Sequence, residues 1–115
     1  MTPEKVILGL SEEIIVFSPN GKEEKVRARI DTGATSSSLD LKLAESLELY
    51  PGMKTRMVRS ASGMKRRPII KVKIKLDGQI IEEGFTLADR SQMNYPALIG
   101  QNILKRGEFL VDPKK

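Results

Sequence analysis

The chain has 115 residues, of which 39% are hydrophobic and 30% charged, a balance typical of one globular domain spanning residues 1–115. It contains no cysteine and no histidine, which excludes disulfide frameworks, thiol chemistry and histidine-based acid–base catalysis. The net charge of +5 favours acidic partners, whereas 4% aromatic residues provide few platforms for stacking single-stranded nucleic acid. No apolar run reaches membrane-spanning length and no signal-peptide pattern is present, so we expect a cytoplasmic protein.

The first third of the chain is expected to form a β-hairpin that leads into Asp31. Residues 6–10 and 13–17 are rich in Ile, Val and Leu, and residues 25–30 alternate between apolar and charged side chains, which is typical of strands. The Ser-Pro-Asn-Gly sequence at 18–21 carries a strong Asn-Gly turn signal.

After Asp31, the pattern favours one short helix and then further strands. Asp40 is placed to cap a helix that runs through Glu48 and ends at Pro51-Gly52. Residues 70–76 alternate between aliphatic side chains and lysine, which predicts a strand with one buried face, and Asp77-Gly78 favours a type I′ turn after it. The remaining expected elements are a return strand over 81–87, a loop over 89–96, an apolar strand over 97–99, helical turns between Gly100 and Gly107, and a last strand over 108–112. Turns at this spacing favour a small closed barrel, although periodicity by itself indicates only a small β-rich domain.

Asp31 lies on a short loop that is rich in small and hydroxyl-bearing residues. The loop begins Asp31-Thr32-Gly33 and continues into a Thr/Ser run. A carboxylate that acts as a general base needs such a loop, because small neighbours admit water and substrate while N–H and O–H donors hold the carboxylate. We expect Gly33 to adopt backbone angles that a larger residue could not. An ordinary β-turn is the alternative, since these residue types are common in turns.

Two segments resemble the signatures of retropepsin-like aspartic proteases. Residues 30–34 (Ile-Asp-Thr-Gly-Ala) resemble their active-site loop, and residues 97–104 (Ala-Leu-Ile-Gly-Gln-Asn-Ile-Leu) resemble their second signature of two apolar residues, a Gly and a short helix. More narrowly, residues 27–34, 87–93 and 109–113 resemble the family labelled "ATP-dependent zinc protease", which is often found beside ATP-grasp glutamate ligases. The resemblance covers nearly the whole chain. It implies a mainly all-β fold, a small closed acid-protease barrel with one or two short helices, and endopeptidase activity.

The resemblance also implies a shared catalytic site. Aspartic proteases use two carboxylates that hold one proton between them, and this chain carries a single Asp-Thr-Gly. The simplest solution is a homodimer in which Asp31 of each subunit flanks one water, and a monomer with Asp31 as a turn residue is the alternative. The residues implied to support the active-site loop are Thr32, Gly33, Ala34 and Gly100. Viral members carry an Arg after the Gly of the second signature, and this Arg pairs with an acid that follows Asp-Thr-Gly-Ala. In this chain, Gln101 and Thr35 stand in those two places. The dimer contact must therefore differ from the viral one.

Residues 56–67 fall where retropepsins have the flap, the hairpin that closes over substrate. The substrate-contacting flap residues would be Arg59, Ser60, Ala61, Ser62 and Gly63. Several cations crowd this segment, so we expect a preference for acidic, glutamate-rich peptides. A solvated charged hairpin is the alternative interpretation.

No cofactor and no metal are expected, because zinc sites are built mainly from Cys and His, and no Gly-rich loop ending in Gly-Lys-Ser/Thr is present for phosphates. The expected partners are a second copy of the chain and a peptide or protein substrate. Binding to nucleic acid or to a membrane is not expected. A non-catalytic dimeric peptide-binding module on the same fold is the main rival, while nucleic-acid binding through the basic hairpins rests on charge alone.

Overall fold

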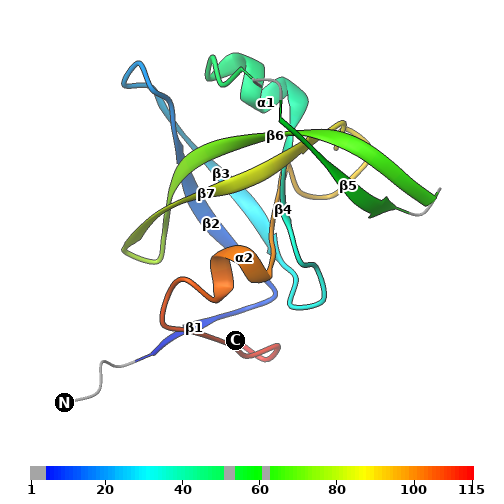
Figure 1. Ribbon diagram of the computed structural model, residues 1–115. Helices are drawn as coiled ribbons and strands as arrows, with labels where there is room; N and C mark the ends of the chain where they lie inside the picture. Colours follow the sequence, from blue (N-terminus) through cyan, green and yellow to red (C-terminus); the bar gives the residue numbers. More distant parts are fainter. Residues whose placement is uncertain (1–4, 51–53, 61–62) are drawn as a thin grey trace.

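The computed structural model describes residues 5–50, 54–60 and 63–115, which form two short helices and nine strands (Figure 1). The strands are β1 (Val6–Leu8), β2 (Ser11–Phe17), β3 (Glu23–Ile30), β4 (Ser37–Asp40), β5 (Thr55–Ser60), β6 (Gly63–Leu76), β7 (Gln79–Ala88), β8 (Ala97–Ile99) and β9 (Phe109–Val111). The helices are α1 (Leu41–Ser46) and α2 (Gln101–Leu104). Within these ranges, no helix has the length and hydropathy needed to cross a membrane.

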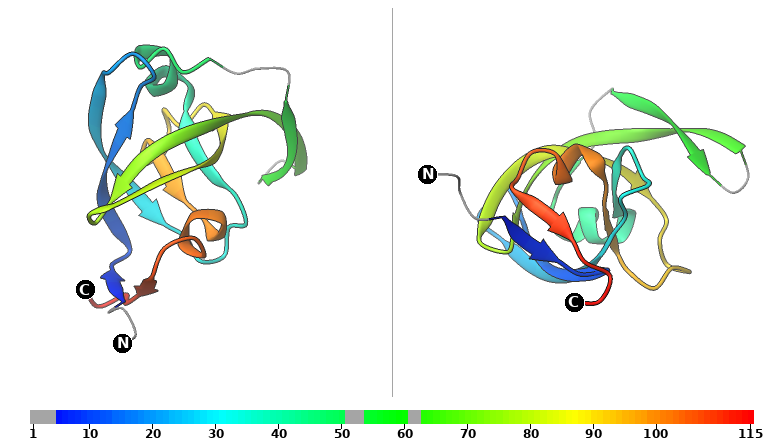
Figure 2. Two further views of the ribbon diagram at one scale, coloured as in Figure 1. Left: turned by 60° about the vertical axis from the view of Figure 1, so that its left-hand side comes forward. Right: turned by 90° about the horizontal axis from the view of Figure 1, so that it is seen from below.

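Six strands close into a barrel in the order β2-β3-β8-β4-β7-β6, because β6 also pairs with β2. Strand β5 pairs with β6 alone and stands away from the barrel, whereas β1 and β9 form a separate two-stranded parallel sheet (Figure 2). Most pairs are antiparallel, but β3–β8 and β4–β7 are parallel. The expected mainly β, closed barrel with short helices is therefore confirmed.

The core follows from the alternation of side chains along the strands. In β6, the aliphatic residues between Ile70 and Leu76 face the barrel interior while the intervening lysines are exposed, as the sequence predicts. Phe85 of β7 is fully buried among them. Burying one aliphatic or aromatic side chain of this size contributes about 1.5–3 kcal/mol, so each buried residue of the barrel interior adds to the stability of the fold.

The two predicted turns differ in how well they follow their signals. Asp77 and Gly78 have φ values of 44° and 82°, as a type I′ turn requires. In the first hairpin, Gly21 alone has a positive φ, and the Ser18 N–H donates to the Lys22 carbonyl at 2.8 Å, which closes a longer loop than the Asn-Gly signal suggests.

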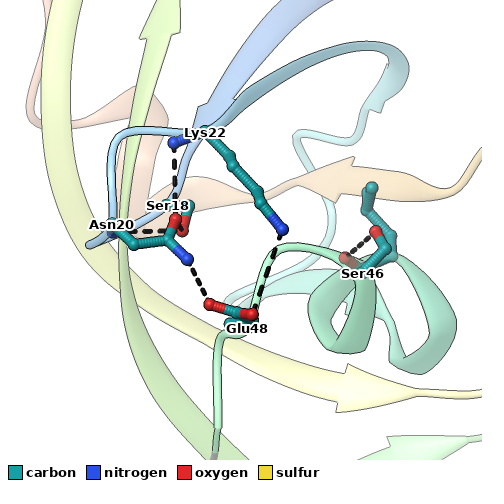
Figure 3. A network of polar contacts seen from close by, with 6 residues as sticks. Ser18, Asn20, Lys22, Ser46 and Glu48 are labelled. Atoms are coloured by element: carbon teal, nitrogen blue, oxygen red, sulfur yellow. Dashed lines mark hydrogen bonds and ion pairs between the residues drawn. The ribbon is translucent and has the colours of Figure 1, made fainter.

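A polar network ties this first loop to the residues that follow α1 (Figure 3). The Asn20 side-chain amide donates to the Glu48 carboxylate, and Lys22 Nζ lies 3.9 Å from Glu48 Oε1. Helix α1 ends at Ser46, earlier than expected, and Glu48 takes a left-handed conformation with φ of 57°. The break expected at Pro51-Gly52 lies outside the described residues.

Strand β4 and the environment of Asp40 differ from expectation. The Thr/Ser run, expected to remain in the loop, enters a strand that is buried at Ser37, Ser38 and Leu39. Asp40 does occupy the N-cap position of α1, but its side chain makes no capping hydrogen bond. Asp40 Oδ1 instead accepts a 2.8 Å hydrogen bond from the Arg90 N–H, because the loop after β7 passes beside the end of β4.

Candidate active site

Asp31 follows directly on the last residue of β3, at the edge where the parallel strands β3 and β8 end together. Its N–H donates to the Ile99 carbonyl at 2.9 Å, which continues the pairing by one residue. Asp31 as a residue is half-buried, and its Oδ1 accepts a 3.0 Å hydrogen bond from the Gly33 N–H. The Asp31 carbonyl accepts the Ala34 N–H at 3.3 Å, so the loop closes on itself around the carboxylate.

The expectation that Gly33 needs unusual backbone angles is wrong, because its φ is not in the left-handed region. A Cβ at this position would lie 3.4 Å from Asp31 Oδ1, which is ordinary van der Waals contact. What Gly33 provides in the described structure is its N–H, together with a backbone that leaves the carboxylate accessible.

The second signature packs directly beneath the Asp31 loop. A Cβ on Gly100 would lie 2.4 Å from the Ser36 carbonyl oxygen and 2.8 Å from that of Ala34, so only glycine fits there. The Gln101 N–H donates to the Ala34 carbonyl at 2.8 Å, and Gln101 Nε2 donates to the Thr32 carbonyl at 2.8 Å. Gln101 therefore holds the loop from one side. Sequence reasoning noted Gln101 only as a departure from the viral pattern and missed this role.

A buried hydrogen-bonded group holds Gly100 in turn, and sequence reasoning missed its members. Ser37 Oγ accepts the Gly100 N–H at 2.9 Å and donates to Asn102 Oδ1 at 2.7 Å. Asn102 Nδ2 donates to the Gly84 carbonyl of β7 at 2.9 Å. The only available signals were Ser37, one of the small polar residues that follow Asp-Thr-Gly, and Asn102, two residues after Gly100. Neither signal reveals a contact that spans more than 60 residues of sequence.

The Thr32 side chain is exposed, and within the described chain its hydroxyl makes no hydrogen bond. The bond to a partner loop that the resemblance implies for Thr32 needs a second subunit and stays a prediction.

Strands β5 and β6 form a hairpin where the flap is expected, and it projects from the barrel (Figure 2). Whether it acts as a flap or is an ordinary charged hairpin stays a prediction. A cavity of about 590 Å³ lies between this hairpin and the Asp31 loop. Its lining comprises Asp31, Gly33, Ala34, Thr35 and Ser36 from the loop and Met57, Val58 and Arg59 from β5. Ser60 pairs with Gly63 at the end of the hairpin, whereas Ala61 and Ser62 lie outside the described residues. The described part of the flap thus brings Arg59 to the same cavity as Asp31.

The cations of the flap are not all available to a substrate. Arg56 Nη1 donates to Ser36 Oγ at 3.1 Å, which links β5 to the active-site loop. Arg66 Nη1 donates to Thr55 Oγ1 at 3.0 Å across the hairpin.

The residues described do not fit the zinc ion that the narrower family label implies. Nowhere in the described ranges do three or more His, Cys, Asp or Glu residues gather as metal ligands would.

Comparison with known proteins gives one family and several relatives. Residues 42–115 match the model of a family described as RimB-like, retropepsin-like aspartic endopeptidase RimB. The match begins after the Asp31 loop. It supports the retropepsin-like resemblance, whereas the label of an ATP-dependent zinc protease finds no support in it.

Two curated relatives and one solved structure are similar to the chain. DNA damage-inducible protein 1 of Candida glabrata is 30% identical over 99% of this chain, and a probable alpha-L-glutamate ligase of Shewanella halifaxensis is 29% identical over all of it. The chain spans only 26% and 30% of the lengths of these relatives. The EIAV protease in complex with the inhibitor HBY-793 superposes with a TM-score of 0.62 at 21% identity, covering 84% of this chain and 85% of that one. This likeness shows the fold.

Proposed function

Because this chain belongs to the RimB-like family of retropepsin-like aspartic endopeptidases, we propose that it hydrolyses peptides as a homodimer, with Asp31 of each subunit flanking one water. The observation that carries the proposal is the Asp31 loop itself. Its carboxylate lines the cavity under the flap, while Gly33, Gly100 and Gln101 fix the surrounding backbone. The Gln101 side chain, nearly 70 residues away in the sequence, helps to hold the loop in this shape.

An apolar surface beside the loop favours the second copy. Ile7 on β1, Leu10 after it and Leu110 on β9 are 41%, 58% and 50% exposed. The Leu10 carbonyl accepts the Ile30 N–H at 2.9 Å, one residue before Asp31. A partner that covers this surface would bring its own loop close to Asp31, since a two-fold contact repeats the same patch on both copies.

Two carboxylates brought together in this way would divide the acid and base roles. Two like charges at close range cannot both ionise, so the pair holds one proton. The ionised carboxylate takes a proton from the water as its oxygen attacks the peptide carbonyl carbon, and the protonated carboxyl donates to the carbonyl oxygen. A proton then passes to the amide nitrogen, and the C–N bond of the tetrahedral intermediate breaks.

We propose acidic, glutamate-rich peptides as the substrate class. The support is the cationic flap, in which Arg59 lines the cavity, and the similarity to a probable alpha-L-glutamate ligase, an enzyme named for joining this amino acid. Cations around a cleft raise the local concentration of an anionic substrate.

The test compares Asp31→Asn with a matched Asp77→Asn control, which makes the same chemical change on an exposed turn. Hydrolysis of a glutamate-rich peptide, followed by mass spectrometry, should vanish in the first and persist in the second. Sedimentation at micromolar concentration should show a dimer. A strictly monomeric parent would refute the shared site, and a dimer that binds the peptide without cleaving it would indicate a peptide-binding module instead.

A further inference from the structure

A row of side chains crosses the outer face of the barrel next to the Asp31 loop. The strand registers place Arg29 of β3 beside Leu98 of β8, Leu98 beside Ser38 of β4, and Ser38 beside Thr86 of β7. The residues before and after them in each strand face the barrel core, so these four face outward. Asp31 follows Arg29 by two positions and therefore belongs to the same face. The flap reaches this face as well, through the contact of Arg56 with Ser36.

Arg90 is fixed against the far end of this row. Its N–H binds Asp40 Oδ1 at 2.8 Å, and its Nε donates to the Tyr95 carbonyl at 2.9 Å. The residue is only 7% exposed. Asp40 lies two positions after Ser38 on β4, so its carboxylate and the Arg90 loop border the same outer face. Since its Nε and N–H are both engaged, Arg90 is held in one place rather than free in solvent.

Arg90 shares this region with two further arginines and one carboxylate. Burial lowers the pKa of Arg90, Asp40 raises it, and the nearby positive charges of Arg67 and Arg29 lower it further. Ile69 of β6 pairs with Thr86, and Arg67 lies two positions before Ile69 on the same strand. Arg67 therefore lies on the same face as Thr86. None of the three arginines forms an ion pair with any carboxylate of the described chain. Arg90 is buried and Arg67 half-buried, and such cations are ordinarily paired, whereas Arg29 is exposed. Asp40 offsets only part of this charge, so the three arginines can accept a further anion.

Ser38 provides an independent sign of a missing partner. It is 7% exposed, and its Oγ is a buried side-chain polar atom that has no hydrogen-bond partner within the described part of the chain. Buried hydroxyls nearly always have a partner, and an unsatisfied one costs about 1–3 kcal/mol. A hydroxyl can donate to a carboxylate oxygen, which is the group that the three arginines also favour.

We propose that Arg29, Arg67 and Arg90, together with Ser38 Oγ, form a subsite that binds one side-chain carboxylate of a peptide lying in the Asp31 cavity. The subsite rests on the proposed peptidase function, and it adds a specific site for an acidic side chain on the barrel face to the general attraction of the cationic flap. Asp40 neutralises part of the positive charge and holds the Arg90 loop, so one carboxylate rather than several would be bound there.

The test measures binding, so that it does not depend on turnover. Acetylated and amidated hexapeptides of six Glu or six Gln are titrated by calorimetry into the Asp31→Asn protein, with each further substitution made in that background. The Glu peptide should bind more tightly. Arg29→Gln and Arg67→Gln should each reduce its affinity by about tenfold, the scale of one charged hydrogen bond, and leave the Gln peptide unaffected. Arg27→Gln is the matched control, because Arg27 lies on the same strand but contacts Ser11, and it should keep the preference.

Ser38→Ala separates a ligand role from a structural one. Removing an unpartnered buried hydroxyl should leave the midpoint of urea unfolding unchanged or higher, yet weaken the Glu peptide several-fold. Equal binding of the two peptides, or equal losses in Arg27→Gln and Arg29→Gln, would refute the subsite and indicate diffuse charge only. If the subsite variants lose binding as expected but the parent cleaves neither peptide, the hydrolase proposal fails and the subsite stands. If the parent cleaves both peptides and the variants change nothing, the subsite fails and the hydrolase proposal stands.

Discussion

Substituting Gly100 by alanine should test whether the second signature shapes the Asp31 loop. The φ of Gly100 is −104°, which alanine adopts easily, so the cost comes from space alone. The new Cβ would lie 2.4 Å from the Ser36 carbonyl oxygen and 2.8 Å from that of Ala34. Both are backbone atoms of the active-site loop, and relieving the overlap requires the loop to move by about 1 Å, to an ordinary contact distance.

The magnitude follows from what that movement would disturb. Overpacking costs about 1–3 kcal/mol, and weakening the 2.8 Å bond between the Gln101 N–H and the Ala34 carbonyl adds about 1 kcal/mol. We expect the free energy of unfolding to fall by about 2–4 kcal/mol. If Asp31 is the catalytic base, a displacement of this size at its carboxylate should lower kcat by about a hundredfold.

The assay pairs urea unfolding with peptide hydrolysis, and Gly84→Ala is the matched control. A Cβ on Gly84 would lie 3.0 Å from Ile69 Cδ1, the end of a flexible side chain that can rotate away. That control should cost less than about 1 kcal/mol and keep the parent activity. A Gly100→Ala protein with the stability and rate of the parent would show that the loop is not held from below.

Three further predictions address stability, assembly and cofactors. Burial by itself would raise the pKa of Glu12, but the hydrogen bonds from the Gly9 N–H and Lys115 outweigh burial, so the pKa is lowered. The ionised Glu12 therefore stabilises the fold fully above its ordinary pKa of 4.5. This stabilisation is lost as the pH falls through the lowered folded-state pKa. Glu12→Gln should therefore flatten this part of the acid limb of a stability–pH curve, and an unchanged limb would contradict it. Leu110→Lys should shift sedimentation towards the monomer and abolish hydrolysis as well. The control Ile80→Lys, on the exposed side of β7, should do neither. If the Leu110→Lys protein remains a dimer, β9 is not part of the interface. Hydrolysis should survive EDTA and should not need ATP, and loss on chelation that added zinc restores would overturn the expectation of metal-free chemistry.

The parts of the fold that sequence predicts are those whose signal is local. The alternation in β6 and the Asp77-Gly78 turn depend on neighbouring residues, and both appear where expected. Strand β4 does not, because its Ser residues have weak strand preference and become buried through long-range bonds. Ser37, for example, bonds Gly100 and Asn102, and its carbonyl accepts the Thr86 hydroxyl at 3.2 Å. Sequence could place Asp31 and Gly100 as candidates, but it could not show that Arg29, Arg67 and Arg90 gather on one face.

If the proposed homodimer forms, the contacts around Asp31 predict an order of events in its assembly. Asn102, Ser37 and Gln101 fix the loop from within a single chain, through bonds that do not involve a second copy. The Thr32 hydroxyl, the group that the family resemblance directs towards a partner, is exposed. If each monomer already holds its loop in the required shape, dimerisation need only bring two rigid halves together, and little ordering entropy opposes it. In the proposed homodimer, the fold of one chain would thus build each half of the site, and the second copy would supply the other carboxylate rather than the conformation of the first.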